Sequence, residues 1–139
     1  MVNSGMISKS IKKLLMVSLL FISVNTFGQL WEPVVENDDG SVYSYDPTTV
    51  KREGDIVTYW ELSDYSKPLK SGYSMVTSSK SKIIQDCKNN RYKVGDLIDY
   101  DGHKGTGNIV NVAMVTETNW YKGGEGLVNE VMKNLVCKQ

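Results

Sequence analysis

Two cysteines, Cys87 and Cys137, constrain this 139-residue chain more than any other feature. Because the sequence has no further thiol, a disulfide has only one pairing, which joins the C-terminal end of the chain to its middle. Such a bond closes a loop of about 50 residues and would contribute roughly 4 kcal/mol in the chain-entropy model. The alternative is a redox-active or nucleophilic cysteine, although there is no Cys-x-x-Cys and His103 is the only imidazole. An oxidising compartment would favour the structural disulfide, and a reducing compartment would favour a free, reactive cysteine.

The N-terminus has the pattern of a secretory signal peptide. A positively charged segment precedes a short apolar run, 14–22, after which the chain becomes polar and small. The charges are Lys9, Lys12 and Lys13. Small residues at Thr26 and Gly28 predict cleavage between Gly28 and Gln29. We therefore expect a signal peptide over 1–28 and a single domain over 29–139.

A membrane anchor is the alternative interpretation of this N-terminus. The apolar run from Leu14 to Val24 is about half of the ~20 residues that a bilayer-spanning helix needs, and no later segment is apolar enough to span. Neither cysteine lies near the cleavage position, so the chain lacks the thiol required for lipid attachment. We expect an exported protein, periplasmic or secreted, that is not lipid-anchored and has no transmembrane segment. In an oxidising compartment Cys87 and Cys137 are expected to form a structural disulfide.

The charge balance argues against nucleic acid as the partner. Removing residues 1–28 removes three lysines and no acidic residue, which leaves 13 basic and 16 acidic side chains and a net charge of −3. Nucleic-acid-binding proteins carry a basic excess that neutralises phosphates. The remaining 111 residues suit one domain with a modest core.

Short strands separated by turns are predicted from Trp31 to about Val115. The segments are 30–35, 42–45, 55–64, 79–87, 92–100 and 109–115, which indicates an antiparallel meander of about six strands. Alternation in 55–64 divides its side chains between two faces, one expected to be core and the other solvated. The first set is Ile56, Thr58, Trp60 and Leu62, and the second is Tyr59, Glu61 and Ser63.

The last segment changes to the period of an amphipathic helix. Its apolar residues are Leu127, Val128, Val131, Met132, Leu135 and Val136. The helix is expected to cover the apolar face of the sheet and to end just before Cys137, because a continued helix would point that thiol away from the sheet. The predicted fold class is α+β, a sheet of about six antiparallel strands with a C-terminal helix packed on it and one disulfide.

Several short motifs follow one another in a characteristic order and spacing. They are Trp31-Glu32-Pro33-Val34; Asp39-Gly40 leading through Tyr43 and Tyr45 to Asp46-Pro47; Gly54-Asp55-Ile56-Val57 and Leu62-Ser63-Asp64-Tyr65; Ser78-Ser79-Lys80-Ser81, Asp86-Cys87 and Arg91-Tyr92; and Gly105-Thr106-Gly107, Trp120 and Val136-Cys137-Lys138. With these motifs the chain resembles the surface-adhesin E family of small exported bacterial proteins, across essentially its whole mature length.

The resemblance implies a six-stranded antiparallel sheet with a C-terminal helix folded back on it, held by a disulfide between Cys87 and Cys137. Adhesins of this family bind host extracellular-matrix and plasma glycoproteins at the bacterial surface and can pair as dimers. They are lipid-anchored, whereas this chain has no cysteine at the cleavage position. The resemblance therefore implies a protein partner, and the sequence itself favours periplasmic or secreted residence.

No catalytic residues, cofactor site or metal site are predicted. The turn 37–40 has some features of a calcium loop, but Val35 and Asp46 occupy the positions of its first carboxylate and last glutamate. The glycine-rich segment 102–107 is neither a Walker A motif nor a dinucleotide-binding motif, since Val110 stands at the third glycine. A single histidine, His103, provides neither a zinc site nor a serine–histidine pair.

A basic cluster on two successive predicted strands is the candidate ligand-binding site. It consists of Lys80, Lys82, Lys88, Arg91 and Lys93. These charges are expected to share the solvent face, where they would suit an acidic glycoprotein segment. The alternative is a solvated face whose lysines prevent edge aggregation. A second candidate is the set Tyr43, Tyr45, Tyr59, Tyr65 and Tyr73, some of which must belong to the core.

Two functions follow from these features. The first is a non-enzymatic binding module of the surface-adhesin E type, which recognises a host or envelope macromolecule through a sheet face. The second is a periplasmic inhibitor or immunity-like protein that blocks a partner enzyme with an inserted loop, for which 101–108 is the candidate. Exposure of the protein on intact cells would favour the first function, and strict periplasmic confinement would favour the second.

Overall fold

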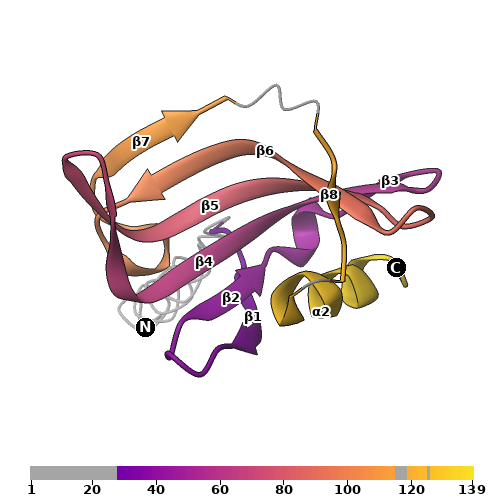
Figure 1. The fold of residues 1–139 in the computed structure, drawn as a ribbon, viewed down its shortest axis with the longest axis horizontal. Coiled ribbons are helices and arrows are strands. Elements are labelled where there is room, and N and C mark those ends of the chain that lie inside the picture. Colours follow the sequence, from indigo (N-terminus) through magenta and orange to yellow (C-terminus); the bar gives the residue numbers. More distant parts are fainter. Residues whose placement is uncertain (1–27, 115–118, 125) are drawn as a thin grey trace, which may run out of the picture.

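A strongly curved antiparallel sheet and one C-terminal helix form the body of the protein (Figure 1). The computed structural model describes residues 28–114, 119–124 and 126–139, so the predicted signal peptide lies outside the described residues except for Gly28. The strands are β1 (Glu32–Glu36), β2 (Val42–Tyr45), β3 (Lys51–Glu53), β4 (Ile56–Ser71), β5 (Ser74–Asp86), β6 (Arg91–Tyr100), β7 (Ile109–Ala113) and β8 (Tyr121–Lys122). The helices are α2 (Leu127–Val136) and the short 3₁₀ turns η1 (Pro47–Thr49) and η2 (His103–Gly105).

The main strands run in a meander, in the order β1-β2-β4-β5-β6-β7, and each pairs antiparallel with the next. These six strands correspond to the six segments expected from the sequence, and the predicted fold class is confirmed. Two short strands lie off this path and were not predicted: β3 pairs with β4, and β8 pairs with β6. Strands of three and two residues are too short to show an alternating pattern.

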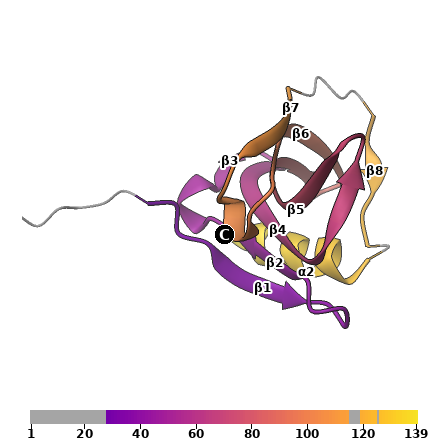
Figure 2. The same cartoon turned by 90° about the vertical axis from the view of Figure 1, so that its left-hand side faces the viewer.

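Strands β4 and β5 form a hairpin much longer than the sequence pattern indicated. The two-residue turns before and after β4 begin with Gly54 and Gly72, whose φ angles of 60° and 59° are readily adopted only by glycine. The pairing of β4 with β5 is interrupted between Asp64 and Leu69, and an interruption of this kind allows the two strands to bend. Figure 2 shows the outer part of this hairpin curling toward the side of the sheet that also carries β8.

The core lies between the sheet and α2. Met132 and Val136 of the helix are fully buried against a cluster formed by Tyr45, Val57, Tyr59 and Ile83. The helix ends at Val136, and Cys137 forms its C-cap. The predicted helix, its packing on the sheet and its end before Cys137 are therefore confirmed.

The expected division of β4 into one core face and one solvated face is wrong. Val57 and Tyr59 face α2, yet Glu61 and Ser63 on the same side are also buried, each 8% exposed. Leu62, on the opposite side, is only 2% exposed. Both faces of this central strand are covered because the sheet curls, so polarity alone did not identify the buried side.

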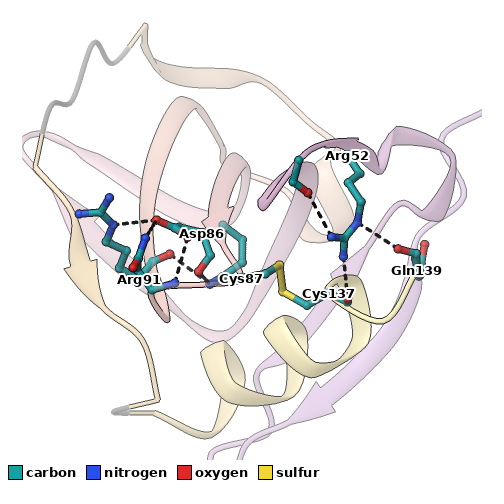
Figure 3. The surroundings of a disulfide bond; sticks show 9 residues. Arg52, Asp86, Cys87, Arg91, Cys137 and Gln139 are labelled. Atoms are coloured by element: carbon teal, nitrogen blue, oxygen red, sulfur yellow. Dashed lines mark hydrogen bonds and ion pairs between the residues drawn. A yellow bond between two sulfur atoms is a disulfide. The ribbon is translucent and has the colours of Figure 1, made fainter.

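The predicted disulfide is present and joins Cys87 to Cys137 (Figure 3). Its Cα atoms are 5.8 Å apart. Cys87 directly follows β5, so the bond ties the end of the helix to the end of the longest hairpin. Within the described part of the chain, no helix has the length and apolar character needed to cross a membrane.

Candidate functional site

The face of the sheet opposite α2, called the outer face below, carries most of the predicted basic cluster. Tyr59 and Ile83 face α2, so their chain neighbours Trp60 and Lys82 point to the outer face, where they are cross-strand partners. Lys93 is paired with Ile84 on the same face. A further lysine, Lys51 of β3, pairs with Thr58 and joins this group.

A groove of about 290 Å³ lies on the outer face between η1, β3, β4 and β5. It is lined by Thr48, Thr49, Lys51, Thr58, Tyr59, Trp60 and Lys82. The η1 turn is fixed by Asp46, which is 1% exposed and accepts hydrogen bonds from the backbone N–H and the hydroxyl of Thr48. Two ammonium groups beside an indole ring and threonine hydroxyls make this groove suited to an anionic group such as a carboxylate or sulfate.

Lys80 also lies on the outer face but has another role. Its Nζ donates a hydrogen bond of 2.8 Å to Gln29 Oε1 and lies 5.7 and 5.1 Å from the ring centroids of Trp31 and Tyr100. These contacts hold the first described residues against the sheet. Lys80 is thus separated in function from Lys82 and Lys93.

Trp120 brings Arg91 and Lys93 together at the edge of β6. The Arg91 guanidinium carbon lies 4.5 Å from the Trp120 ring centroid, and Lys93 Nζ lies 4.8 Å from it. The strand β8 follows directly, and its Tyr121 is paired with Tyr92 in the ladder. The two cations therefore help to dock this segment on β6 while they stay partly exposed.

Asp86 orders the turn between β5 and β6. It accepts hydrogen bonds from Asn89 N and Nδ2 at 3.0 and 2.8 Å, and it forms an ion pair with Arg91 Nε at 2.9 Å (Figure 3). The hydrogen bonds from Asn89, reinforced by Arg91, lower the pKa of the Asp86 carboxyl to about 2. Lys88 is exposed in this turn, so the predicted cluster extends from the outer face to the end of the hairpin.

The loop 101–108, the candidate inhibitory segment, is a compact connection between β6 and β7. Asp101 accepts hydrogen bonds from Asn108 N and Nδ2, and these lower the pKa of Asp101. Ser78 Oγ accepts from Gly105 N and donates to the Gly102 carbonyl. Lys104 is exposed at the tip with a left-handed φ of 55°, an uncommon conformation for a residue other than glycine.

A second groove, of about 370 Å³, lies between this loop and the N-terminal strands. It is lined by Trp31, Pro33, Glu36, Val42, Ser44, Leu62, Asp64 and Lys104. Asp64 accepts a hydrogen bond from Lys104 N at 3.0 Å and lies 2.9 Å from His103 Nδ1. The only histidine of the chain thus anchors the loop to β4.

The tyrosines do not form one surface. Tyr45 and Tyr59 are core residues, Tyr43 and Tyr65 are partly buried on the α2 side, and Tyr73 is fully exposed in the turn between β4 and β5.

The turn 37–40 joins β1 to β2 by backbone hydrogen bonds between Asn37 and Ser41 and between Gly40 and Asn37. Across the residues that the structure describes, no group of three acidic, histidine or cysteine side chains is placed to hold a metal ion.

Three residues that shape these sites were not predicted as part of them. Lys51 lies on the unpredicted strand β3, and Trp120 contacts cations about thirty positions earlier in the chain. The third, Glu61, was expected on a face opposite the apolar set, but burial raises the pKa of its carboxyl to about 7. The alternation of charged residues along 80–93 indicated that these charges share the solvent face of the sheet. No local pattern indicated which distant aromatic ring would lie over them.

Solved structures with a similar fold are known. Crystal form II of Haemophilus influenzae protein E matches with a TM-score of 0.56 and 16% identity, over 78% of this chain and 87% of that one. Protein E from non-typeable Haemophilus influenzae matches with a TM-score of 0.54 and 16% identity, over 78% and 75% of the two chains. At this identity the similarity shows a common fold. A comparison with curated proteins finds no match.

The sequence gives more specific evidence. The family model described as Surface-adhesin protein E matches residues 31–138, which include every described strand and the helix. The match extends over both cysteines and the whole basic cluster. The chain belongs to the Surface-adhesin protein E family.

Proposed function

We propose that this protein is an exported, non-enzymatic binding protein whose outer face recognises an acidic segment of a host extracellular-matrix or plasma glycoprotein. The observation that carries the proposal is the gathering of Lys51, Lys82 and Lys93 on one face around a groove that contains Trp60. A chain that is expected to carry a net charge of −3 after cleavage has no general reason to concentrate cations on one face. Membership of an adhesin family supports the same function.

The residues of the cluster contribute differently to this surface. Lys82 and Lys88 make no ion pair in the described part of the chain, whereas Lys93 also lies over the Trp120 ring. Arg91 is paired with Asp86, and Lys80 holds Gln29. We therefore assign the contact primarily to Lys51, Lys82, Lys88 and Lys93, with Arg91 positioned by Asp86.

Charge reversal tests this assignment. Single exposed charges contribute roughly 1 kcal/mol or less, so Lys82→Glu and Lys93→Glu are combined. With a sulfated heparin oligosaccharide as the probe, we expect binding at least about tenfold weaker than for wild type and a smaller dependence on salt. The matched control is Lys67→Glu with Lys70→Glu on the exposed part of the β4–β5 hairpin, which leaves the affinity unchanged. Equal weakening by both pairs would indicate a net-charge effect without a site.

Export is part of the same proposal. With cleavage between Gly28 and Gln29, the mature chain would begin at Gln29. Gln29 and Trp31 both contact Lys80, so the mature N-terminus would lie against the sheet. We expect N-terminal sequencing of the exported protein to begin at Gln29. Protease treatment of intact cells then separates surface exposure from periplasmic confinement.

Pairing of two copies is a further element of the proposal. Strand β7 is an edge of the sheet, and Ile109, Val112 and Met114 on or beside it are 58%, 54% and 74% exposed. An apolar edge strand of this kind readily adds a strand from another chain. Sedimentation equilibrium should show dimers that Val112→Lys converts to monomers, and monomers in the wild type at all concentrations would contradict pairing.

A periplasmic inhibitor is the second candidate function, and the compactness of the loop 101–108 favours it. Inhibitory loops gain affinity when they are ordered before they bind. Here Ser78 of β5 and Asp64 of β4 bind the loop, and Asp101 closes it onto Asn108. Strict periplasmic confinement, together with polyanion binding unchanged by Lys82→Glu and Lys93→Glu, would favour this function over adhesion.

A further inference from the structure

The face of the sheet that packs on α2 continues beyond the helix as a buried polar region. Glu61 is paired with Tyr45 on β2 and with Ser81 on β5. The next row in the ladder contains Tyr43, Ser63, Ser79 and Asp99. Glu61, Ser63, Ser79 and Asp99 are 8%, 8%, 4% and 6% exposed. A cluster with two carboxyl groups is thus removed from bulk solvent inside the curve of the sheet.

The two carboxyl groups differ in their partners. Asp99 accepts a hydrogen bond of 2.6 Å from Ser79 Oγ and one of 3.1 Å from Asn111 Nδ2. Tyr65 OH in turn donates to Ser79 over 3.4 Å. No residue that the structure describes donates a hydrogen bond or forms an ion pair with Glu61, and desolvation alone acts on its carboxyl. The Glu61 carboxyl oxygens are not fully enclosed, so this group keeps a narrow contact with solvent in place of a protein partner.

Tyrosines surround this unpartnered carboxyl. Tyr59 precedes Glu61 by two positions on β4, and Tyr43 pairs with Ser63 two positions after it, so both tyrosines share its face of the sheet. Burial, with smaller contributions from neighbours that include Glu61, raises the pKa values of Tyr43 and Tyr59. Tyr45 lies directly across the ladder. Aromatic faces and one carboxylate together attract an organic cation, because the ring faces are electron-rich and the carboxylate supplies the opposite charge.

We propose that Glu61, with Tyr43, Tyr45 and Tyr59, forms a recessed binding site for one organic monocation, either a primary ammonium or a guanidinium group. The site offers a single carboxyl group without a protein partner, because Asp99 is already satisfied by Ser79 and Asn111. A divalent metal ion would need more anionic oxygen ligands than this. The site is opposite in charge to the basic outer face and lies on the other side of the sheet, so it does not depend on the proposed function.

Small cations test the site directly. The probes are n-butylammonium and n-butylguanidinium, with n-butanol as the neutral control of similar size, and the readout is the ¹³C NMR resonance of the Glu61 carboxyl. We expect saturable shifts with at least one cation, none with butanol, and a lower Glu61 pKa when the cation is bound. The other ionisable groups on this face include Tyr43, Tyr45, Tyr59, Tyr65, Tyr92, Asp99 and Tyr121, so their resonances are followed in the same titration.

Variants separate a binding site from a general charge effect. Glu61→Gln should weaken cation binding at least tenfold, whereas Glu53→Gln, which removes an exposed charge on β3, should leave it unchanged. Tyr73→Phe, at an exposed tyrosine in the turn between β4 and β5, should also leave cation binding unchanged. Circular dichroism checks that each variant is folded. If neither cation gives a saturable shift, or if Glu61→Gln binds as well as wild type, the proposal is overturned.

The cation has two sources, and a blocked Gly-Gly-Lys-Gly-Gly peptide distinguishes them. Binding of the peptide as well as n-butylammonium identifies the site as one for a side chain of a partner protein. Binding of the small cation without the peptide identifies a site for a free amine. Each result supports the site, and the absence of binding by all three cationic probes contradicts it.

Discussion

The Arg52 side chain joins the short strand β3 to the end of the chain: its Nη2 donates a hydrogen bond of 2.6 Å to the carbonyl oxygen of Cys137 (Figure 3). Its Nε donates to the Gln139 carbonyl and its Nη1 to the Gly54 carbonyl, each at 3.2 Å. A cation at this position also suits the negative end of the α2 dipole. The C-terminus is therefore held twice, by the disulfide and by Arg52.

Replacing Arg52 by alanine should lower the free energy of unfolding by about 1 kcal/mol, because charged hydrogen bonds are lost at an exposed site. Denaturant unfolding measures this change, and hydrogen exchange should become faster at 137–139. Arg52→Lys keeps the charge without the planar set of donors and should be intermediate. The assignment fails if Lys51→Ala, on the same strand, costs as much.

The disulfide should contribute more than any single side chain. Replacing Cys87 and Cys137 together by serine should reduce the free energy of unfolding by roughly 4 kcal/mol, since the loop between them spans 50 residues. Mass spectrometry after alkylation should detect no free thiol in the unfolded, non-reduced exported protein and both thiols after reduction. Two free thiols without reductant would contradict the bond.

Glu61 should make stability fall as the pH rises. Burial raises the pKa of its carboxyl from 4.5 to about 7, so between these values the folded protein holds a proton that the unfolded chain releases. The free energy of unfolding should therefore decrease across this window, by about 3 kcal/mol at most. Glu61→Gln should remove this slope and be more stable than wild type at pH 8. The same slope in wild type and Glu61→Gln, measured by urea unfolding, would show that another group titrates.

Asp86 should make stability fall as the pH falls, in more acidic solution than the range in which Glu61 acts. The hydrogen bonds from Asn89, with the help of Arg91, lower the pKa of Asp86 from 3.8 to about 2. Its stabilisation is therefore complete above pH 4 and is lost as the pH falls toward 2. Asp86→Asn should be less stable at neutral pH and should show a flatter acid limb in thermal unfolding. The exposed turn variant Asp38→Asn is the control, and an equal flattening there would assign the effect to general charge.

The elements that could be predicted were those with a long repeating pattern. The helix stripe from Val128 to Val136 and the alternation in β4 and β6 extend over several periods, so the meander and the covering helix followed from them. Strands β3 and β8 are too short to show a pattern, and the contacts that hold them include distant ones, Arg52 with Cys137 and Trp120 with Arg91. No local pattern records such contacts.

The candidate site was predictable in one respect and not in another. The spacing of Lys82, Arg91 and Lys93 indicated the solvent face, because side chains alternate along a strand. The contribution of Lys51 and the cover provided by Trp120 depend on how the curved sheet brings distant segments together. The burial of Glu61 has the same origin, since curvature covers a face that polarity marked as solvated.

The central claim, that the outer face binds an acidic macromolecule, is tested most directly by a backbone amide NMR titration with a heparin oligosaccharide at physiological salt. The largest shift changes should fall on 48–51, 58–60, 82–84 and 91–95, around the groove between Lys51 and Lys82. Shift changes confined to the loop 101–108, or spread evenly over all lysines including Lys67 and Lys70, would contradict it.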